Sequence, residues 1–318
     1  MTSAEFIRCL VQKHLSIKAG KSYKLTADLD SLENMWLAVY GLGKLEIFSY
    51  LYGNCQSEID FYAWLQQTKG ATAIAEADLL FEQMQCQETN LNVEEHTAPR
   101  LLTAAQHQHW QEWGYLKISG LVPAEYCERV KAFTCNYLGI NLADPTTWYP
   151  VHKDWHGLML QVYQHPDMEA IRRHPAVKQL FAELYQTEKI VANTDKVSYN
   201  PPETEQWRFR HHRLHWDIDH HQSPGYYIQG LIYLDDVPED RGPLKLIPGF
   251  HRRYDEYQRQ FPDHMAAQNA IKEKSGAIPI PGKLGDIVLW QQMLPHAASI
   301  NQSDKPRFVQ YLSFTRLD

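Results

Sequence analysis

The tripeptide His215-Trp216-Asp217 contains residue types that bind transition metals, within the stretch L-H-W-D-I-D. Alternate side chains of an extended segment leave the same side of the backbone, so His215 and Asp217 would point together. A third candidate, His296, comes much later, in the stretch L-P-H-A-A-S-I-N. Two imidazoles and one carboxylate on one face of an octahedral ion form the facial triad that holds Fe(II) in non-haem oxygenases. These residues therefore predict a metal site.

Arg307 is the candidate partner for an anionic ligand near this metal. It follows His296 in H-A-A-S-I-N-Q-S-D-K-P-R and directly precedes the alternating run F-V-Q-Y-L-S-F (308–314), which predicts a strand. A planar guanidinium at the start of a core strand is well placed to bind a carboxylate with two donors. The alternative interpretation is a solvated arginine in a polar turn.

Further histidines and an acid surround the H-x-D tripeptide. Asp219 could serve with Asp217 or in its place, and the nearby histidines are interpreted as loop residues or as partners that orient the ligands. These histidines are His211, His212, His220 and His221.

Four stretches give the chain a resemblance to the phytanoyl-CoA dioxygenase family of Fe(II)/2-oxoglutarate oxygenases. They are L-H-W-D (214–217), Y-L-D-D-V-P-E-D-R-G-P-L-K-L-I-P-G-F-H (233–251), G-K-L-G-D-I-V-L-W (282–290) and H-A-A-S-I-N-Q-S-D-K-P-R (296–307). The resemblance covers roughly residues 101–318 in order and spacing. Two departures are present: His296 is followed by Ala297-Ala298 where the family often has Gly-Ser, and Phe250 stands in place of a serine in Pro-Gly-Ser-His.

The resemblance implies a function and a set of cofactors. His215, Asp217 and His296 would bind Fe(II), and Arg307 would bind the C5 carboxylate of 2-oxoglutarate. Gln229 is a further candidate for cosubstrate binding. The implied reaction uses O2 to hydroxylate an unactivated C–H of a small molecule, with release of succinate and CO2. Related halogenases have a small residue where Asp217 stands, so its presence favours hydroxylation.

The second half of the chain is predicted to consist mainly of short β-strands. Short apolar or alternating runs separated by polar turns are typical of a sandwich or jelly roll. The expected strands are 114–118, 190–197, 226–234, 243–247, 277–281, 286–291 and 308–314, with helices at 123–138, 166–173, 175–185 and 252–261. The fold class predicted is α+β, with a double-stranded β-helix (jelly roll, cupin-like) core flanked by helices and an N-terminal helical region.

The first part of the chain has a different pattern. Residues 1–85 carry apolar residues at helical spacing and no catalytic pattern, which predicts a helical region. The polar, aperiodic segment 86–100 is interpreted as a linker to a dioxygenase domain at 101–318. The helical region is either structural or a docking surface for a partner, such as a carrier protein.

Composition restricts the partners and the compartment. The net charge of −7, from 31 basic and 38 acidic residues, argues against a nucleic-acid-binding surface and a polybasic membrane patch. No apolar run approaches a membrane span, and the first thirty residues lack a secretion-signal pattern. The five scattered cysteines contain no C-x-x-C, which favours free thiols in a reducing cytoplasm.

The substrate and two other functional classes stay open. The irregular segment 140–165 could supply substrate contacts, through Trp148, Tyr149, His152, Trp155 and His156. Lys196, Arg208, Arg210 and Arg213 either bind an anionic or zwitterionic group, such as an amino acid, or are surface charges. The competing classes are a non-catalytic cupin-like binding protein and a hydrolytic zinc site.

Overall fold

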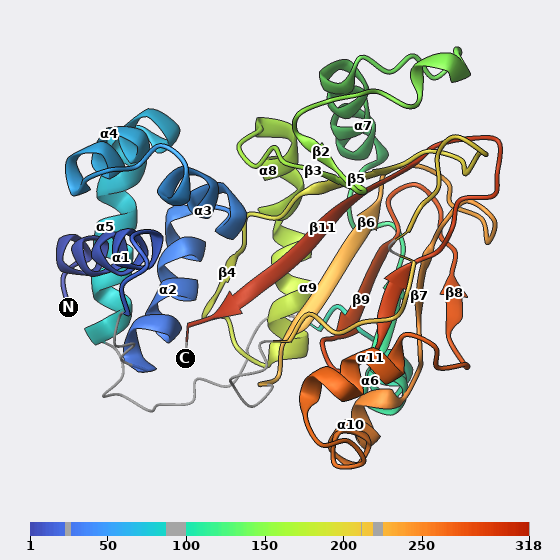
Figure 1. The fold of residues 1–318 in the computed structure, drawn as a ribbon. Helices are drawn as coiled ribbons and strands as arrows, with labels where there is room; N and C mark the ends of the chain where they lie inside the picture. Colours follow the sequence, from blue (N-terminus) through green and yellow to red (C-terminus); the bar gives the residue numbers. More distant parts are fainter. Residues whose placement is uncertain (23–26, 87–99, 211, 219–224, 318) are drawn as a thin grey trace. The chain divides into compact units, whose positions relative to one another are not determined.

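The computed structural model describes the whole chain except residues 23–26, 87–99, 211, 219–224 and 318 (Figure 1). It divides into two compact units. The first comprises Met1–Pro99, Phe181–Asp195 and Phe314–Asp318, and the second comprises Arg100–Leu180 and Lys196–Ser313. None of the helices in the described part of the chain combines the length and apolar character that a membrane span requires.

The first unit contains a bundle of helices near the N-terminus. Its helices are α1 (Ser3–Lys18), α2 (Ala27–Tyr40), α3 (Lys44–Tyr52), α4 (Glu58–Lys69) and α5 (Ala71–Cys86). They enclose an aromatic core that includes Phe6, Trp36, Phe61 and Phe81, all fully buried. In the described residues, the predicted N-terminal helical region is confirmed, and its apolar positions at helical spacing pack against one another rather than facing water.

The strands of the described residues form two antiparallel sheets. The larger sheet has the order β1-β9-β6-β11-β5-β3-β2, with β4 paired to β11, and the smaller has the order β10-β7-β8. The strands are β1 (Tyr115–Ile118), β2 (Trp155–His156), β3 (Met159–Leu160), β4 (Ile190–Ala192), β5 (Val197–Asn200), β6 (Ile228–Tyr233), β7 (Leu244–Leu246), β8 (Ile278–Ile280), β9 (Ile287–Gln291), β10 (His296–Ala298) and β11 (Arg307–Arg316).

Within the second unit, the two sheets share one apolar core. Leu231 and Val288 of the larger sheet belong to the same buried cluster as Leu244 and Leu246 of the smaller one. Tyr233 joins the sheets directly: its hydroxyl donates to the carbonyl of Ile280 at 2.7 Å and accepts from the backbone N–H of Leu244 at 3.1 Å. This buried tyrosine therefore fixes the separation of the two sheets that carry the candidate site.

The remaining helices are α6 (Ala104–Trp113), α7 (Ala124–Leu138), α8 (Pro166–Arg172), α9 (Pro175–Tyr185), α10 (Tyr254–Gln258) and α11 (His264–Ile271), with 3-10 turns η2 (Pro145–Thr147) and η3 (Phe250–Arg253). The helices predicted at 123–138, 166–173, 175–185 and 252–261 correspond to α7, α8, α9 and, in shorter form, α10, whereas α6 and α11 lie outside those four ranges. The single strand predicted over residues 190–197 is wrong. The segment is split because β4 pairs with residues 314–316 of β11 whereas β5 pairs with residues 307–310, which leaves 193–196 outside both ladders.

Candidate metal centre

A backbone pairing brings the two predicted histidine ligands together. His215 and His296 form an antiparallel bridge, in which each N–H donates to the other carbonyl at 3.1 Å. Side chains that face each other in such a pair lie on the same side of the sheet. The two imidazole centroids are accordingly 4.8 Å apart.

Trp216 fixes the segment that carries His215 and Asp217. Its side chain is 3% exposed, and its indole N–H donates to the Met293 carbonyl at 2.9 Å. The ring packs against Phe250 and Tyr254, with centroids 5.7 and 5.3 Å away. Because alternate residues of an extended segment point to opposite sides, burial of Trp216 turns Asp217 back to the side of His215.

His215, Asp217 and His296 converge as a group of three potential metal ligands. One ligand atom from each lies within 4.8 Å of the others. Asp217 Oδ1 is 3.7 Å from His215 Nε2, and Asp217 Oδ2 is 3.4 Å from His296 Nε2. Neighbouring ligands of an octahedral ion with bonds of about 2.1 Å would be about 3.0 Å apart, so small side-chain adjustments suffice. The His296 side chain is 6% exposed and that of Asp217 57%, so solutes can reach the group from one side.

The hydrogen bonds of the histidines favour metal binding through Nε2. His215 Nδ1 lies 3.1 Å from the Arg213 carbonyl and His296 Nδ1 lies 3.0 Å from the Leu294 carbonyl. A carbonyl oxygen only accepts, so each Nδ1 must carry the proton. In a neutral imidazole, the Nε2 lone pair then faces the carboxylate. A cation bound between these two lone pairs and the carboxylate would stabilise all three groups. The backbone carbonyls that accept from Nδ1 thus orient the imidazoles for metal binding, as hydrogen-bond partners of metal-binding histidines commonly do.

Asp217 is held as a carboxylate. Burial raises the pKa of Asp217, but, with the imidazoles protonated, hydrogen bonding and charge from His296, then the charge of His215 and a hydrogen bond from Gln229, outweigh it and hold this pKa well below its usual range. A bound cation would replace the two protons and keep the carboxylate ionised in the same way. The group therefore offers an anionic oxygen together with two nitrogens, a donor set that fits Fe(II).

Arg307 is a buried cation that lacks an anionic partner among the described residues. Its side chain is 1% exposed, with Nη1 donating to the Gly242 carbonyl and Nη2 to Ser198 Oγ, both at 3.0 Å. Its Nε has no hydrogen-bond partner in the described structure. Burial lowers the pKa of Arg307. A guanidinium buried without a carboxylate is costly, so this geometry suits a site that receives an anionic ligand.

The turn before β11 holds Arg307 in place. Arg241 donates from Nε and Nη2 to the carbonyl of Pro306, at 2.9 and 2.6 Å, and its Nη2 also pairs with Asp235 at 2.8 Å. Asp235 belongs to the acidic turn of the 233–251 stretch, so this turn has a structural role: it anchors the backbone next to Arg307.

Gln229 lies beside Asp217. Its Nε2 donates to Asp217 Oδ2 at 2.9 Å, and its Oε1 accepts from the Trp290 indole at 3.0 Å. Neither this contact nor that of Ser198 with Arg307 could be read from the sequence, because both depend on which strands are neighbours. The predicted strand 226–234 contained Gln229 but indicated no partner for it, and Ser198 lies one residue beyond the predicted strand 190–197.

The other candidates of the segment 140–165 are distributed over both faces of the larger sheet. His156 pairs with Met159, which pairs with Ser198, so His156 lies on the sheet face that bears Ser198. Trp155 pairs with Leu160, which pairs with Val197, so Trp155 lies on the opposite face. Trp155 stacks instead on Trp207, with centroids 6.2 Å apart.

Several side chains of this segment and its surroundings are held by backbone groups. The Trp148 indole donates to the Asn141 carbonyl, the Tyr149 hydroxyl donates to the Pro202 carbonyl, and His152 Nδ1 accepts from the Asp154 N–H. His212 is hydrogen-bonded to the Phe209 carbonyl. His211, Asp219, His220 and His221 lie outside the described residues.

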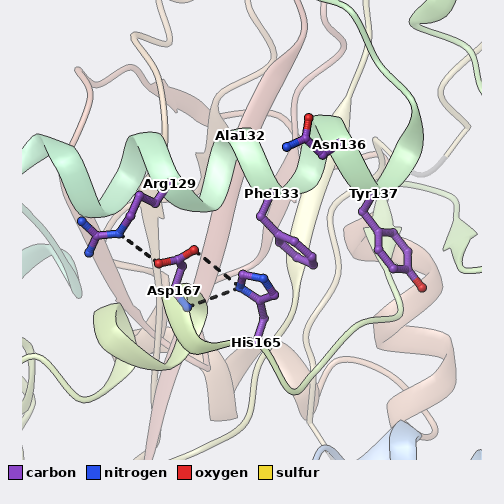
Figure 2. Close-up of a pocket in the computed structure, with 7 residues that line it drawn as sticks. All are labelled: Arg129, Ala132, Phe133, Asn136, Tyr137, His165 and Asp167. Atoms are coloured by element: carbon purple, nitrogen blue, oxygen red, sulfur yellow. Dashed lines mark hydrogen bonds and ion pairs between the residues drawn. The ribbon is translucent and has the colours of Figure 1, made fainter.

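A separate surface hollow of about 550 Å³ lies along α7 and contains none of the candidate ligands (Figure 2). Its polar groups engage one another: Arg129 pairs with Asp167 at 2.9 Å, and His165 Nδ1 caps α8 by accepting from the Asp167 N–H. His165 also stacks on Phe133, at a centroid separation of 3.6 Å. This hollow is thus distinct from the metal-ligand group.

The antiparallel sheets and the His/Asp/His group fit one class of proteins, the non-haem iron oxygenases that use 2-oxoglutarate. The family model described as "Phytanoyl-CoA dioxygenase (PhyH)" matches residues 110–309. The chain belongs to this family and is an Fe(II)/2-oxoglutarate-dependent dioxygenase.

Individual relatives are distant. A Dictyostelium discoideum protein described as "Putative phytanoyl-CoA dioxygenase" is 22% identical over 265 residues, which cover 65% of this chain and 73% of that protein.

Two enzymes of nogalamycin biosynthesis, both described as non-heme and alpha ketoglutarate dependent, are similar in structure. The carbocyclase SnoK has a TM-score of 0.51 at 18% identity and covers 68% of this chain and 86% of its own. The epimerase SnoN has a TM-score of 0.50 at 17% identity, with coverages of 67% and 82%. At these low sequence identities, the similarity to SnoK and SnoN shows only that the fold is shared.

Proposed function

We propose that this protein hydroxylates an unactivated C–H of a small molecule, with 2-oxoglutarate and O2 as cosubstrates and succinate and CO2 as coproducts. His215, Asp217 and His296 would hold the iron. The observation that carries the proposal is the convergence of two Nε2 atoms on the Asp217 carboxylate while each Nδ1 is occupied by a backbone carbonyl. With iron and 2-oxoglutarate bound, the centre would supply the oxidising power for the C–H bond.

The protein's own residues would bind and orient the cosubstrate. Arg307 would bind the C5 carboxylate through its free Nε and its Nη atoms. Ser198 would add a hydroxyl donor, because its oxygen already accepts from Arg307, which leaves its proton available for the same carboxylate. Ser198 would thereby supply the hydroxyl that Ala298 lacks.

The fold supports the same proposal, because two antiparallel sheets around one core fit a double-stranded β-helix. The proposed catalytic domain spans 101–318, after the helical region 1–85 and a linker at 86–100, although Phe181–Asp195 and Phe314–Asp318 belong to the first compact unit. The described cysteines Cys9, Cys55, Cys127 and Cys135 are free thiols, which favours a cytoplasmic location.

For the substrate, we propose a small molecule, free or carrier-bound, with an anionic or zwitterionic group, such as an amino acid or a related biosynthetic intermediate. Lys196 directly precedes β5, and its carbonyl accepts a hydrogen bond from the Tyr311 N–H, so the backbone is extended there. The Lys196 side chain, two residues before Ser198, therefore lies on the same face of the sheet as Ser198. Arg208, Arg210 and Arg213 are exposed, and Arg213 pairs with Glu273 at 3.1 Å. Lys196 and His156 are therefore preferred as substrate contacts. SnoK and SnoN are described as a carbocyclase and an epimerase, so hydroxylation is one of several outcomes that this fold supports.

The test is succinate formation by the purified protein, with Fe(II), 2-oxoglutarate and a library of amino acids and carrier-bound acyl groups. The proposal expects succinate that depends on both iron and 2-oxoglutarate and increases with the right substrate. Metal binding without any 2-oxoglutarate turnover would favour the non-catalytic binding protein. Zinc-dependent hydrolysis that ignores 2-oxoglutarate would favour the hydrolase.

A further inference from the structure

The side chains of Trp290 and Gln229 form a continuous hydrogen-bonded path to Asp217. Trp290 on β9 and Gln229 on β6 are register partners, so their side chains leave the same face of the larger sheet. The Trp290 indole donates to Gln229 Oε1 at 3.0 Å, and Gln229 Nε2 donates to Asp217 Oδ2 at 2.9 Å. Trp290 is 1% exposed, so the path starts from a fixed point of the core.

The direction of this path is determined by chemistry. An indole N–H can only donate, so the oxygen of the Gln229 amide must face Trp290. The amide nitrogen must then face Asp217, where a carboxylate can only accept. Rotation of the amide by 180° would place two donors together at one end and two acceptors together at the other. Trp290 therefore fixes which end of Gln229 meets the candidate ligand.

We propose that Trp290 and Gln229 are positioning residues that restrict Asp217 to binding the metal through one oxygen. The inference rests on the proposed metal site. Asp217 lies on an irregular segment, and its side chain is 57% exposed, so packing alone leaves the carboxylate free to rotate. The donation from Gln229 engages Oδ2 and holds the carboxylate plane. A carboxylate that bound through both oxygens would occupy a position that the cosubstrate needs.

Trp290 also contacts a second candidate ligand. Its ring lies against the His296 imidazole, with centroids 5.1 Å apart and planes at 50°. One indole thus supports His296 by packing and Asp217 through Gln229. Loss of its N–H alone would disturb Asp217 and leave the packing against His296 in place.

The experiment measures Co(II) binding to the full-length protein by calorimetry, together with the visible d–d spectrum at saturating Co(II) and the affinity of that form for 2-oxoglutarate. Gln229→Met removes both hydrogen bonds at similar volume, and Trp290→Phe removes the N–H and keeps an aromatic ring. Gln310→Met is the control, because Gln310 is a buried glutamine on β11 that donates to the Met168 carbonyl and not to a candidate ligand. Thermal unfolding checks that each variant is folded.

The expected result is a roughly 10- to 100-fold weaker Co(II) affinity for Gln229→Met, a smaller loss for Trp290→Phe, and little change for Gln310→Met. At saturating Co(II), both site variants should show a shifted d–d spectrum and weaker 2-oxoglutarate binding, which a general loss of stability would not produce. Wild-type-like spectra and affinities in folded Gln229→Met or Trp290→Phe would overturn the inference while leaving the metal site intact. A wild-type protein that binds no Co(II) would instead overturn the proposed function.

Discussion

Replacement of Arg307 by lysine tests the cosubstrate site most directly. Lysine keeps the charge but replaces a planar group of five donors with a single ammonium. In the structure the guanidinium uses Nη1 and Nη2 on Gly242 and Ser198 and leaves Nε free, so it can bind a carboxylate while it remains anchored. An ammonium group at the end of a flexible chain cannot do both.

The size of the effect follows from the bonds lost. A hydrogen bond to a charged group contributes roughly 1.5–3 kcal/mol to binding, and lysine keeps part of the charge attraction to the 2-oxoglutarate carboxylate. We expect a loss of about 1.4–2.7 kcal/mol in cosubstrate binding, equivalent to a 10- to 100-fold higher KM for 2-oxoglutarate. Metal affinity without cosubstrate should be unchanged, because Arg307 is outside the group of His215, Asp217 and His296.

The assay combines 2-oxoglutarate kinetics with Fe(II) titration on the same preparation. Arg316→Lys is the matched control, since Arg316 lies on the same strand but is exposed at its other end. An Arg307→Lys variant with wild-type KM for 2-oxoglutarate would remove Arg307 from the cosubstrate site. A large loss of iron affinity would show that its role is structural.

Three further predictions concern the surroundings of the site and the helical unit. Ser198→Ala should weaken 2-oxoglutarate binding by about 0.5–1.5 kcal/mol, with metal affinity unchanged; equal 2-oxoglutarate affinities by calorimetry would refute a contact of this hydroxyl. Trp216→Ala should lower the free energy of unfolding by about 3–5 kcal/mol in urea titrations, because the ring is 3% exposed and packed in the core; a loss below 1 kcal/mol would contradict its anchoring role. In the helical unit, burial raises the pKa of Glu33, but hydrogen bonds and charge from His14 and Lys13 outweigh it and lower this pKa to about 2. Because the pKa of Glu33 is lower in the folded than in the unfolded protein, its ionised form stabilises the fold at pH values above the unfolded-state pKa. The free energy of unfolding should therefore fall by roughly 3 kcal/mol at most as the pH falls from about 4.5 to 2. Glu33→Gln should flatten that part of the stability–pH curve relative to wild type, and an identical curve would refute the assignment.

Local sequence patterns determined the ligand types and most of the elements. The alternation in His215-Trp216-Asp217 is local, since a strand of period two has one apolar side for the core and one polar side for the site. The structure buries Trp216 and brings His215 and Asp217 to one side for that reason. The strands β6, β9 and β11 and the helices α7, α8 and α9 likewise follow from apolar period and length.

Only the tertiary structure decided which distant residues meet. Nothing in the pattern around His296 specifies that its backbone pairs with His215, or that Gln229 faces both Trp290 and Asp217. The same holds for Ser198 beside Arg307, and for the division of residues 190–200 between the two ends of β11. Periodicity tells which face of a strand a residue occupies. The neighbour on that face depends on strand order and register, which are set by packing of the whole core.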